Sequence, residues 1–137
     1  SYTGIDIAKN IVEFNQKKFL LNKKVSFFHG DILEKKFLKL TNFDYTFVSG
    51  TFNNKIENNW LWMKKTLKKL FALTKKALIF NNLSYYVDFY DKKLFYIKPE
   101  KVFNFCKKKL GPKIIIDNSY ELKTNTIPFE FTTCVKK

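Results

Sequence analysis

Acidic and polar side chains follow three predicted strands, and these residues are the best suited to ligand chemistry. The first is Asp6, which ends the short strand that opens the chain and precedes an amphipathic helix. A carboxylate at the carboxyl end of a parallel strand can accept hydrogen bonds from both vicinal hydroxyls of a ribose. An aspartate there can also cap the helix that follows by accepting from its free backbone N–H groups. Asp6 is therefore a candidate ribose ligand, with helix capping as the alternative.

A second acidic residue, Asp31, follows a glycine directly after the apolar strand 25–29. Its carboxylate can accept a hydrogen bond from the exocyclic amine of adenine, while Ile7 and Ile32 would cover the two faces of the ring. The alternative is an ordinary turn, for which a Gly-Asp pair is typical. The only histidine, His29, ends the same strand; we interpret it as a structural residue, with a minor role beside the adenine as the alternative.

A polar loop follows the third predicted strand. It consists of Ser49, Gly50, Thr51, Phe52 and Asn53. Ligands of open α/β sheets bind just outside the carboxyl ends of the strands. We therefore expect this loop to take part in ligand binding.

The elements that would position these residues alternate regularly along the chain. Strands are expected at 2–6, 25–29, 43–49, 76–81, 113–117 and 128–135, and helices at 8–21, 57–75 and 99–110. Alternation of this kind predicts an α/β fold with a mostly parallel, Rossmann-like sheet and helices on both of its faces. Because no helix separates the last two strands, they should form an antiparallel hairpin at the edge of the sheet. Residues 1–137 are expected to form a single domain.

The charge of the chain is high, but its composition argues against a nucleic-acid groove. The formal net charge is +14, and all 26 basic residues are lysines. Arginine, the residue that binds guanine edges and phosphates in a bidentate manner, is absent. The lysines are also spread over every predicted helix and loop. A compositional bias explains this distribution better than a polyanion-binding surface.

Several other classes of protein are disfavoured. No apolar run approaches the ~20 residues that a membrane span needs, and the chain does not open like a signal peptide, so a cytoplasmic protein is expected. One histidine and two isolated cysteines, Cys106 and Cys134, do not supply a metal site; both cysteines are expected to be buried thiols. A Gly-x-Ser-x-Gly nucleophile elbow is also absent.

Together, the three stretches around Asp6, Asp31 and Ser49–Asn53 resemble class I S-adenosylmethionine-dependent methyltransferases, from the second strand of that fold to its seventh. The segments 80–88 and 128–131 add a likeness to small bacterial members of the family. The resemblance covers essentially the whole chain. It implies S-adenosylmethionine as the cofactor and methyl transfer as the reaction.

The resemblance also implies roles for individual residues. Asp6 would hold the ribose and Asp31 the adenine, with Ile7 and Ile32 beside the ring. The loop after the fourth strand of the family faces the methyl group and the acceptor. Cofactor contacts are therefore expected at Ser49 and Gly50; acceptor contacts at Thr51, Phe52, Tyr85 and Tyr86; and catalytic roles at Asn53 and Asp88. Asp88 would act as a general base, and its alternative is a solvated loop residue.

One motif of the family has no counterpart in these residues. A glycine-rich turn follows the first strand of the family, whereas Gly4, Gly30, Gly50 and Gly111 never cluster. The chain is therefore expected to be truncated before the second strand. In the family the first strand lies between the second and the fourth, so its absence would leave two strand edges unpaired. We expect the 137-residue chain to bind the cofactor weakly or not at all, and therefore to have little or no activity on its own.

The acceptor is expected to be a small or sugar-like molecule, and the oligomeric state stays open. Two alternatives to an enzyme remain. One is a binding module that keeps the methyltransferase fold without catalysis. The other is a basic nucleic-acid-binding domain, which would gather its lysines and aromatic side chains on one face.

Overall fold

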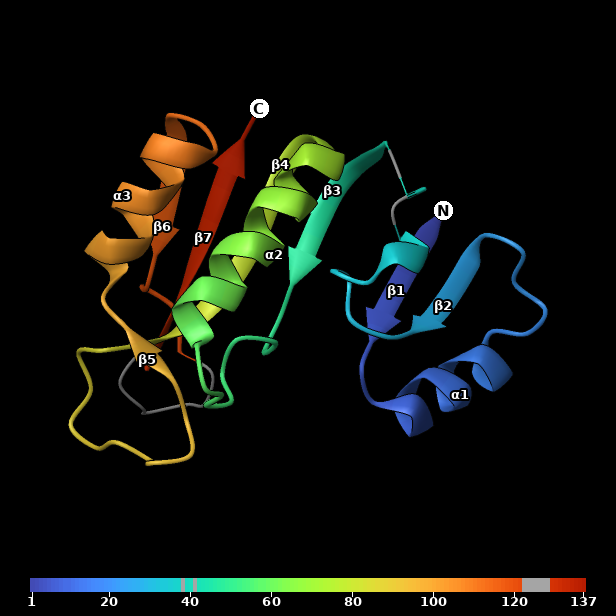
Figure 1. Cartoon of the computed structure of the whole chain (residues 1–137), viewed down its shortest axis with the longest axis horizontal. Coiled ribbons are helices and arrows are strands. Elements are labelled where there is room, and N and C mark those ends of the chain that lie inside the picture. The colour runs from blue at the N-terminus through green and yellow to red at the C-terminus, as the bar shows by residue number, and fades with distance from the viewer. Residues whose placement is uncertain (38, 41, 122–128) are drawn as a thin grey trace. The chain divides into compact units, whose positions relative to one another are not determined.

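The computed structural model describes residues 1–37, 39, 40, 42–121 and 129–137. Within them the chain divides into two compact units, Ser1–Leu40 and Thr41–Lys137. The first unit is blue to cyan in Figure 1 and the second runs from green to red. Each unit contains its own sheet, one of two strands and one of five. The single domain expected over residues 1–137 remains a prediction.

The first unit is a parallel β-α-β motif. Its elements are β1 (Tyr2–Asp6), α1 (Lys9–Lys18), β2 (Val25–His29) and the 3-10 helix η1 (Lys35–Phe37). Strands β1 and β2 are parallel, and their register pairs Asp6 with His29. This register brings the carboxyl ends of both strands to the same edge of the small sheet, as Figure 1 shows.

Helix α1 is shorter than the predicted helix 8–21. Its last regular turn ends where the Phe19 N–H bonds to the Asn15 carbonyl at 3.0 Å, and a tighter turn follows in which Asn22 bonds back to Phe19 at 2.9 Å. The Phe19 ring lies 5.7 Å from the ring of Phe27 on β2. The chain thus leaves the helix early because Phe19 turns inward onto the sheet.

The second unit is built on a mixed sheet. Its elements are β3 (Phe43–Val48), α2 (Asn59–Leu73), β4 (Thr74–Ser84), β5 (Tyr96–Ile97), α3 (Pro99–Lys109), β6 (Lys113–Asp117) and β7 (Glu130–Lys136). The strand order is β3-β4-β7-β6, and β5 pairs with β4. Strands β3 and β5 run parallel to β4, whereas β7 is antiparallel to both β4 and β6. The predicted antiparallel hairpin at the sheet edge is confirmed.

The boundary between α2 and β4 differs from the predicted helix 57–75 and strand 76–81. Asn58 caps the helix by accepting from the Leu61 N–H at 3.1 Å, so the helix starts later. At its other end Thr74 is already extended, with its hydroxyl donating to the Leu70 carbonyl at 2.7 Å. Strand β4 then continues to Ser84 because it is central and pairs with three other strands. Strand β7 begins at Glu130, and residue 128 of the predicted strand lies outside the described residues.

Helices α2 and α3 pack on the same face of this sheet, and Figure 1 shows both in front of it. The core between them is formed by fully buried apolar side chains, among them Met63, Leu67, Leu78, Phe80, Val102, Cys106, Phe131 and Val135. The alternation of β4 and the three- and four-residue spacing of α2 point these side chains at one another. Burial raises the pKa of the Cys106 thiol to about 12, so this cysteine is an inert part of the core, while Cys134 is half-buried. Within the described residues, no helix is long and apolar enough to cross a membrane.

Candidate functional site

The carboxyl end of β1 presents the first predicted ligand, Asp6. Its side chain is exposed, and one carboxylate oxygen accepts from the Ala8 N–H at 2.8 Å. This bond spans only two residues and fixes the direction of the carboxylate, although the N-cap of α1 is Ala8 itself and has no side-chain cap. Asp6 therefore does not cap the helix. Its bond to the Ala8 N–H closes a local turn, and the second carboxylate oxygen remains available to a ligand.

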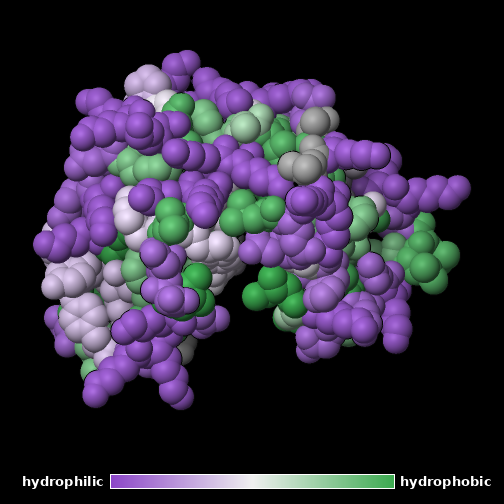
Figure 2. All heavy atoms as spheres, in the orientation of Figure 1, coloured by the Kyte–Doolittle hydropathy of each residue, from purple (hydrophilic) through white to green (hydrophobic). Residues whose placement is uncertain are grey.

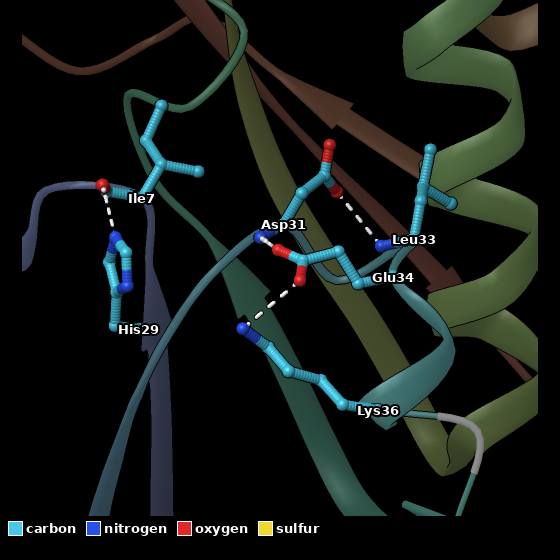
Figure 3. A network of polar contacts seen from close by, with 6 residues as sticks. All are labelled: Ile7, His29, Asp31, Leu33, Glu34 and Lys36. Carbon is cyan, nitrogen blue, oxygen red and sulfur yellow. Dashed lines mark hydrogen bonds and ion pairs between the residues drawn. The ribbon is translucent and has the colours of Figure 1, made fainter.

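The ends of β1 and β2 are tied together by hydrogen bonds. The Gly30 N–H donates to the Asp6 carbonyl at 2.9 Å, and the His29 Nε2 lies 3.1 Å from the Ile7 carbonyl oxygen. Figure 3 shows His29 beneath the chain that leaves β1. The predicted structural role of His29 fits this contact. Ile7 remains 72% exposed next to it, so its side chain is available to an apolar ligand.

Asp31 begins a tight turn after β2. The Asp31 carboxylate accepts from the Leu33 N–H at 2.8 Å, and its backbone N–H donates to Glu34 at 2.6 Å. Glu34 also pairs with Lys36 at 3.0 Å, and Figure 3 shows this chain of contacts around Asp31. Gly30 has φ +144°, a backbone conformation that residues with a side chain rarely adopt. This backbone favours glycine at the turn, and Ile32 is half-buried within it.

The Glu34 carboxylate gives this turn a pH dependence. Its pKa lies below the ordinary 4.5, first because the Asp31 N–H donates to it and then because the Lys36 ammonium does. A lowered folded pKa means that the stabilisation is present above pH 4.5 and is lost as the pH falls through the folded value. We expect the Asp31 amide resonance to shift with this titration in the wild type, and the shift to be absent in Glu34→Gln. An NMR pH titration checks this, with Glu13→Gln on α1 as the control; an unchanged titration in Glu34→Gln would contradict the assignment.

The loop after β3 carries the other predicted residues. Gly50 adopts φ +67°, in the left-handed region, and its N–H donates to the Asn81 side-chain oxygen on β4 at 2.8 Å. The Asn53 N–H then bonds back to the Gly50 carbonyl at 3.2 Å. Ser49 and Thr51 are exposed at this turn. The loop is therefore a closed turn anchored to the neighbouring parallel strand.

Phe52 points inward from the same loop. It is 1% exposed, and its ring lies edge-on to Trp62 at 5.4 Å and to Phe80 at 6.4 Å. The ring therefore anchors the loop to the core. In contrast, the Asn53 side-chain oxygen is buried without a hydrogen-bond partner in the described residues. An unpartnered acceptor of this kind is costly unless a ligand or water completes it.

A second loop, residues 85–95, packs against the first. The Phe95 N–H donates to the Asn53 carbonyl and the Lys55 N–H to the Lys93 carbonyl, both at 2.8 Å. An isolated antiparallel bridge joins Asn54 to Leu94. The loop also holds Asp88, which is exposed. The structure thus brings Asn53 and the second loop together at the carboxyl end of β4.

The second loop and β5 present a group of aromatic rings that we call the tyrosine cluster: Tyr85, Tyr86, Tyr90 and Tyr96. Successive rings are 4.9–5.9 Å apart at tilted or edge-to-face angles. The Tyr86 hydroxyl donates to Glu100 at 2.5 Å, which is the first cause of the raised pKa of Tyr86 and of the lowered pKa of Glu100. The Tyr90 hydroxyl donates to the Tyr85 carbonyl. Only Tyr85 and Tyr86 were predicted from the sequence as acceptor contacts. The high density of tyrosine between residues 85 and 96 was the signal that could have identified Tyr90 and Tyr96 as well.

Comparison with known proteins gives the family context of this architecture. No protein-family profile matches the chain. A Mycobacterium tuberculosis protein that is named only provisionally as a methyltransferase is 26% identical over 99% of this chain and 78% of its own length. The match therefore spans both units and all of the predicted ligand positions.

Solved methyltransferase structures share the fold. The magnesium protoporphyrin IX methyltransferase of Synechocystis, solved with bound S-adenosylmethionine, matches with a TM-score of 0.65 at 12% identity over 98% of this chain and 58% of its own. The methyltransferase domain of a bacterial Hen1 matches with a TM-score of 0.65 at 13% identity, over 98% of this chain and 77% of its own. This chain has the class I methyltransferase fold. The fold class and the resemblance predicted from the sequence are confirmed.

A further solved structure with this fold belongs to an RNA assembly. A chain of the Pnkp1/Rnl/Hen1 RNA repair complex matches with a TM-score of 0.64 at 12% identity. The match covers 99% of the present chain and 31% of the chain in the complex. That protein is part of an RNA assembly. At this level of identity the likeness extends to the fold alone.

Proposed function

We propose that this chain binds S-adenosylmethionine at the carboxyl ends of β1 and β2 and promotes transfer of the methyl group to a small or sugar-like acceptor. The observation that carries the proposal is the tie between these two strands. Their parallel register and the 2.9 Å bond from Gly30 to the Asp6 carbonyl hold the two predicted nucleoside ligands, Asp6 and Asp31, at one edge.

The residues at this edge fit the nucleoside half of the cofactor. Asp6 offers an exposed carboxylate whose direction is fixed by the Ala8 N–H, which suits a pair of ribose hydroxyls. Ile7 offers an exposed apolar side chain, which suits a face of adenine. When bound, the cofactor supplies an electrophilic methyl group on a sulfonium. Because no cluster of glycines is present to receive its methionine half, we expect a dissociation constant in the millimolar range.

The second unit carries the residues proposed to bind the acceptor. Methyl transfer depends mainly on alignment of the two reacting atoms, and within this unit the two hydrogen-bonded loops after β3 and β4 provide fixed groups that can hold an acceptor. The unpartnered Asn53 oxygen can accept from an acceptor hydroxyl or amine. The tyrosine cluster offers ring faces for a sugar or another small ring. Asp88, which is exposed on the loop 85–95, is the proposed general base.

The acceptor class is tested by incubating the chain with methyl-tritiated S-adenosylmethionine in excess, together with a metabolite extract and total RNA, and then separating the RNA and the small-molecule products from the unreacted cofactor. We expect label in the small-molecule products, and a reduction of roughly tenfold in Asn53→Ala because one hydrogen bond to the acceptor is lost. Asn104→Ala, at an exposed asparagine on α3, is the matched control. Label in neither fraction would contradict catalysis and favour the binding-module alternative.

An RNA acceptor is the second candidate. The net charge of +14 and the position of the Lys98 ammonium 5.1 Å above the Tyr85 ring are features that single-stranded RNA can use through phosphate contacts and stacking. Figure 2 shows hydrophilic residues over most of the visible surface of both units. Label in the RNA fraction of the same experiment would favour this candidate over a small acceptor.

A further inference from the structure

A polar network joins β4, β7 and the loop after β3 within the second unit, and sequence patterns gave no sign of it. Asn81 on β4 donates through its side-chain nitrogen to both carboxylate oxygens of Glu130 on β7, at 3.2 and 3.1 Å. Tyr120 donates to the same carboxylate at 3.0 Å and shares a 2.8 Å hydrogen bond with Thr132. The network ends at the Gly50 N–H, which donates to the Asn81 oxygen at 2.8 Å.

The orientation of the Asn81 amide is determined by its neighbours. A backbone N–H can only donate and a carboxylate can only accept. The Asn81 oxygen must therefore face Gly50, and its nitrogen must face Glu130. One side chain thus links the loop after β3 to a strand that follows it by about eighty residues in the chain.

Glu130 is an unusual residue to find at this position. It is only 7% exposed and forms no ion pair with the described residues. A buried carboxylate without a cation is unfavourable unless hydrogen-bond donors surround it. Here the donors are Asn81 and Tyr120, so the carboxylate in turn fixes both of them.

The loop depends on this anchor because Gly50 has a left-handed backbone with φ +67° and no side chain of its own to hold it. Apart from its chain neighbours, no atom lies within 4 Å of the place where its Cβ would be, so Gly50 itself is not held by packing. Phe52 anchors the following part of the loop in the core, and the bond to Asn81 holds Gly50. The direction of Asn53, three residues further on, follows from this turn through the bond between the Asn53 N–H and the Gly50 carbonyl.

We propose that Asn81 and Glu130 form a positioning pair that holds the loop 49–53 in the conformation that presents the Asn53 oxygen. The functional part of this inference rests on the proposed role of Asn53 toward the acceptor. The structural part does not, and it is tested in the absence of any ligand.

The test uses two single variants and their combination. In Asn81→Asp, two carboxylates face each other, so residue 81 should withdraw from Glu130 and from Gly50. In Glu130→Gln the effect should be smaller, because the glutamine oxygen can still accept from Asn81. In the double variant N81D/E130Q, the new carboxylate can accept from both Gly50 and the glutamine amide. The double variant should therefore restore the network.

The readout is hydrogen exchange of the Gly50 amide, measured by NMR, beside global unfolding in urea. We expect exchange roughly tenfold faster in N81D, as for the loss of one net hydrogen bond, and near wild type in N81D/E130Q. Asn104→Asp on the exposed side of α3 is the control for the added charge. If N81D does not fold, Asn81→Ala answers the same question, because it also removes the acceptor from Gly50.

Exchange at Gly50 that is unchanged in both N81D and N81A would overturn the proposal, as would a double variant that is no better than N81D. Binding of S-adenosylhomocysteine is measured separately at the ends of β1 and β2. If the wild type does not bind S-adenosylhomocysteine, the proposed function is contradicted. The exchange rate of the Gly50 amide still tests the positioning pair in that case.

Discussion

Replacing Asp6 by alanine is expected to weaken binding of S-adenosylhomocysteine by about tenfold or more. Because the wild type is expected to bind in the millimolar range, binding by the variant should fall below detection. Hydrogen bonds to a charged group contribute ~1.5–3 kcal/mol each. Asp6 is the last residue of β1 and supplies the only carboxylate of that strand. The measurement is a titration that follows the amide resonances of Ile7 and Asp31 by NMR.

The matched variant for this experiment is Asp6→Asn. Asparagine can keep the 2.8 Å bond from the Ala8 N–H, so the turn stays intact while the negative charge is lost. We expect binding between that of the wild type and that of Asp6→Ala. Equal binding by all three proteins would mean that Asp6 serves only its local turn and does not contact the ribose.

Replacing Leu67 by alanine is expected to lower the free energy of unfolding of the second unit by about 3 kcal/mol, the middle of the range for large-to-small core substitutions. Leu67 is fully buried and lies among the apolar side chains that join α2 to β4 and α3. Urea unfolding followed by tryptophan fluorescence measures the loss. Trp60 and Trp62 are the two tryptophans of the chain, and both lie on α2.

Leu61 provides the control on the same helix. Its side chain is 41% exposed, so Leu61→Ala should change the free energy of unfolding by less than about 1 kcal/mol. Similar losses for both variants would show that α2 does not pack its Leu67 face against the sheet.

The elements with clear periodicity could be predicted from the sequence. The apolar spacing of α2 and the Pro99 start and glycine end of α3 gave both helices to within two residues. Their local signals agree with the tertiary structure, which is why the prediction succeeded. The extended start of β4 at Thr74 was missed, because the hydrogen bond from its hydroxyl to Leu70 and the contact with Thr46 of β3 depend on packing between segments.

Other features have no local signal. Strand β5 has only two residues, Tyr96 and Ile97, and exists because it pairs with the end of β4. The pair Asn81 and Glu130 is 49 residues apart in sequence. Neither feature produces a periodic pattern that a reader of the sequence can detect.

The candidate site likewise contains residues whose positions could be predicted from the sequence and residues whose positions could not. Asp6, Asp31 and the loop after β3 lie at strand ends, where the alternation of elements predicted them. Phe52 was expected at the acceptor, but apolar burial draws its ring into the core against Phe80. The reason is that a loop of mixed character does not reveal which of its side chains turns inward until the neighbouring strands are in place.

The most direct test of the central claim is ultraviolet cross-linking of tritiated S-adenosylmethionine to the chain, followed by digestion at lysine and mass spectrometry of the labelled peptides. If the carboxyl ends of β1 and β2 hold the nucleoside, the label will be found in peptides 1–9 and 25–35 and will disappear when unlabelled S-adenosylhomocysteine is added in excess. Label confined to other peptides, or label that excess S-adenosylhomocysteine does not remove, would contradict the account.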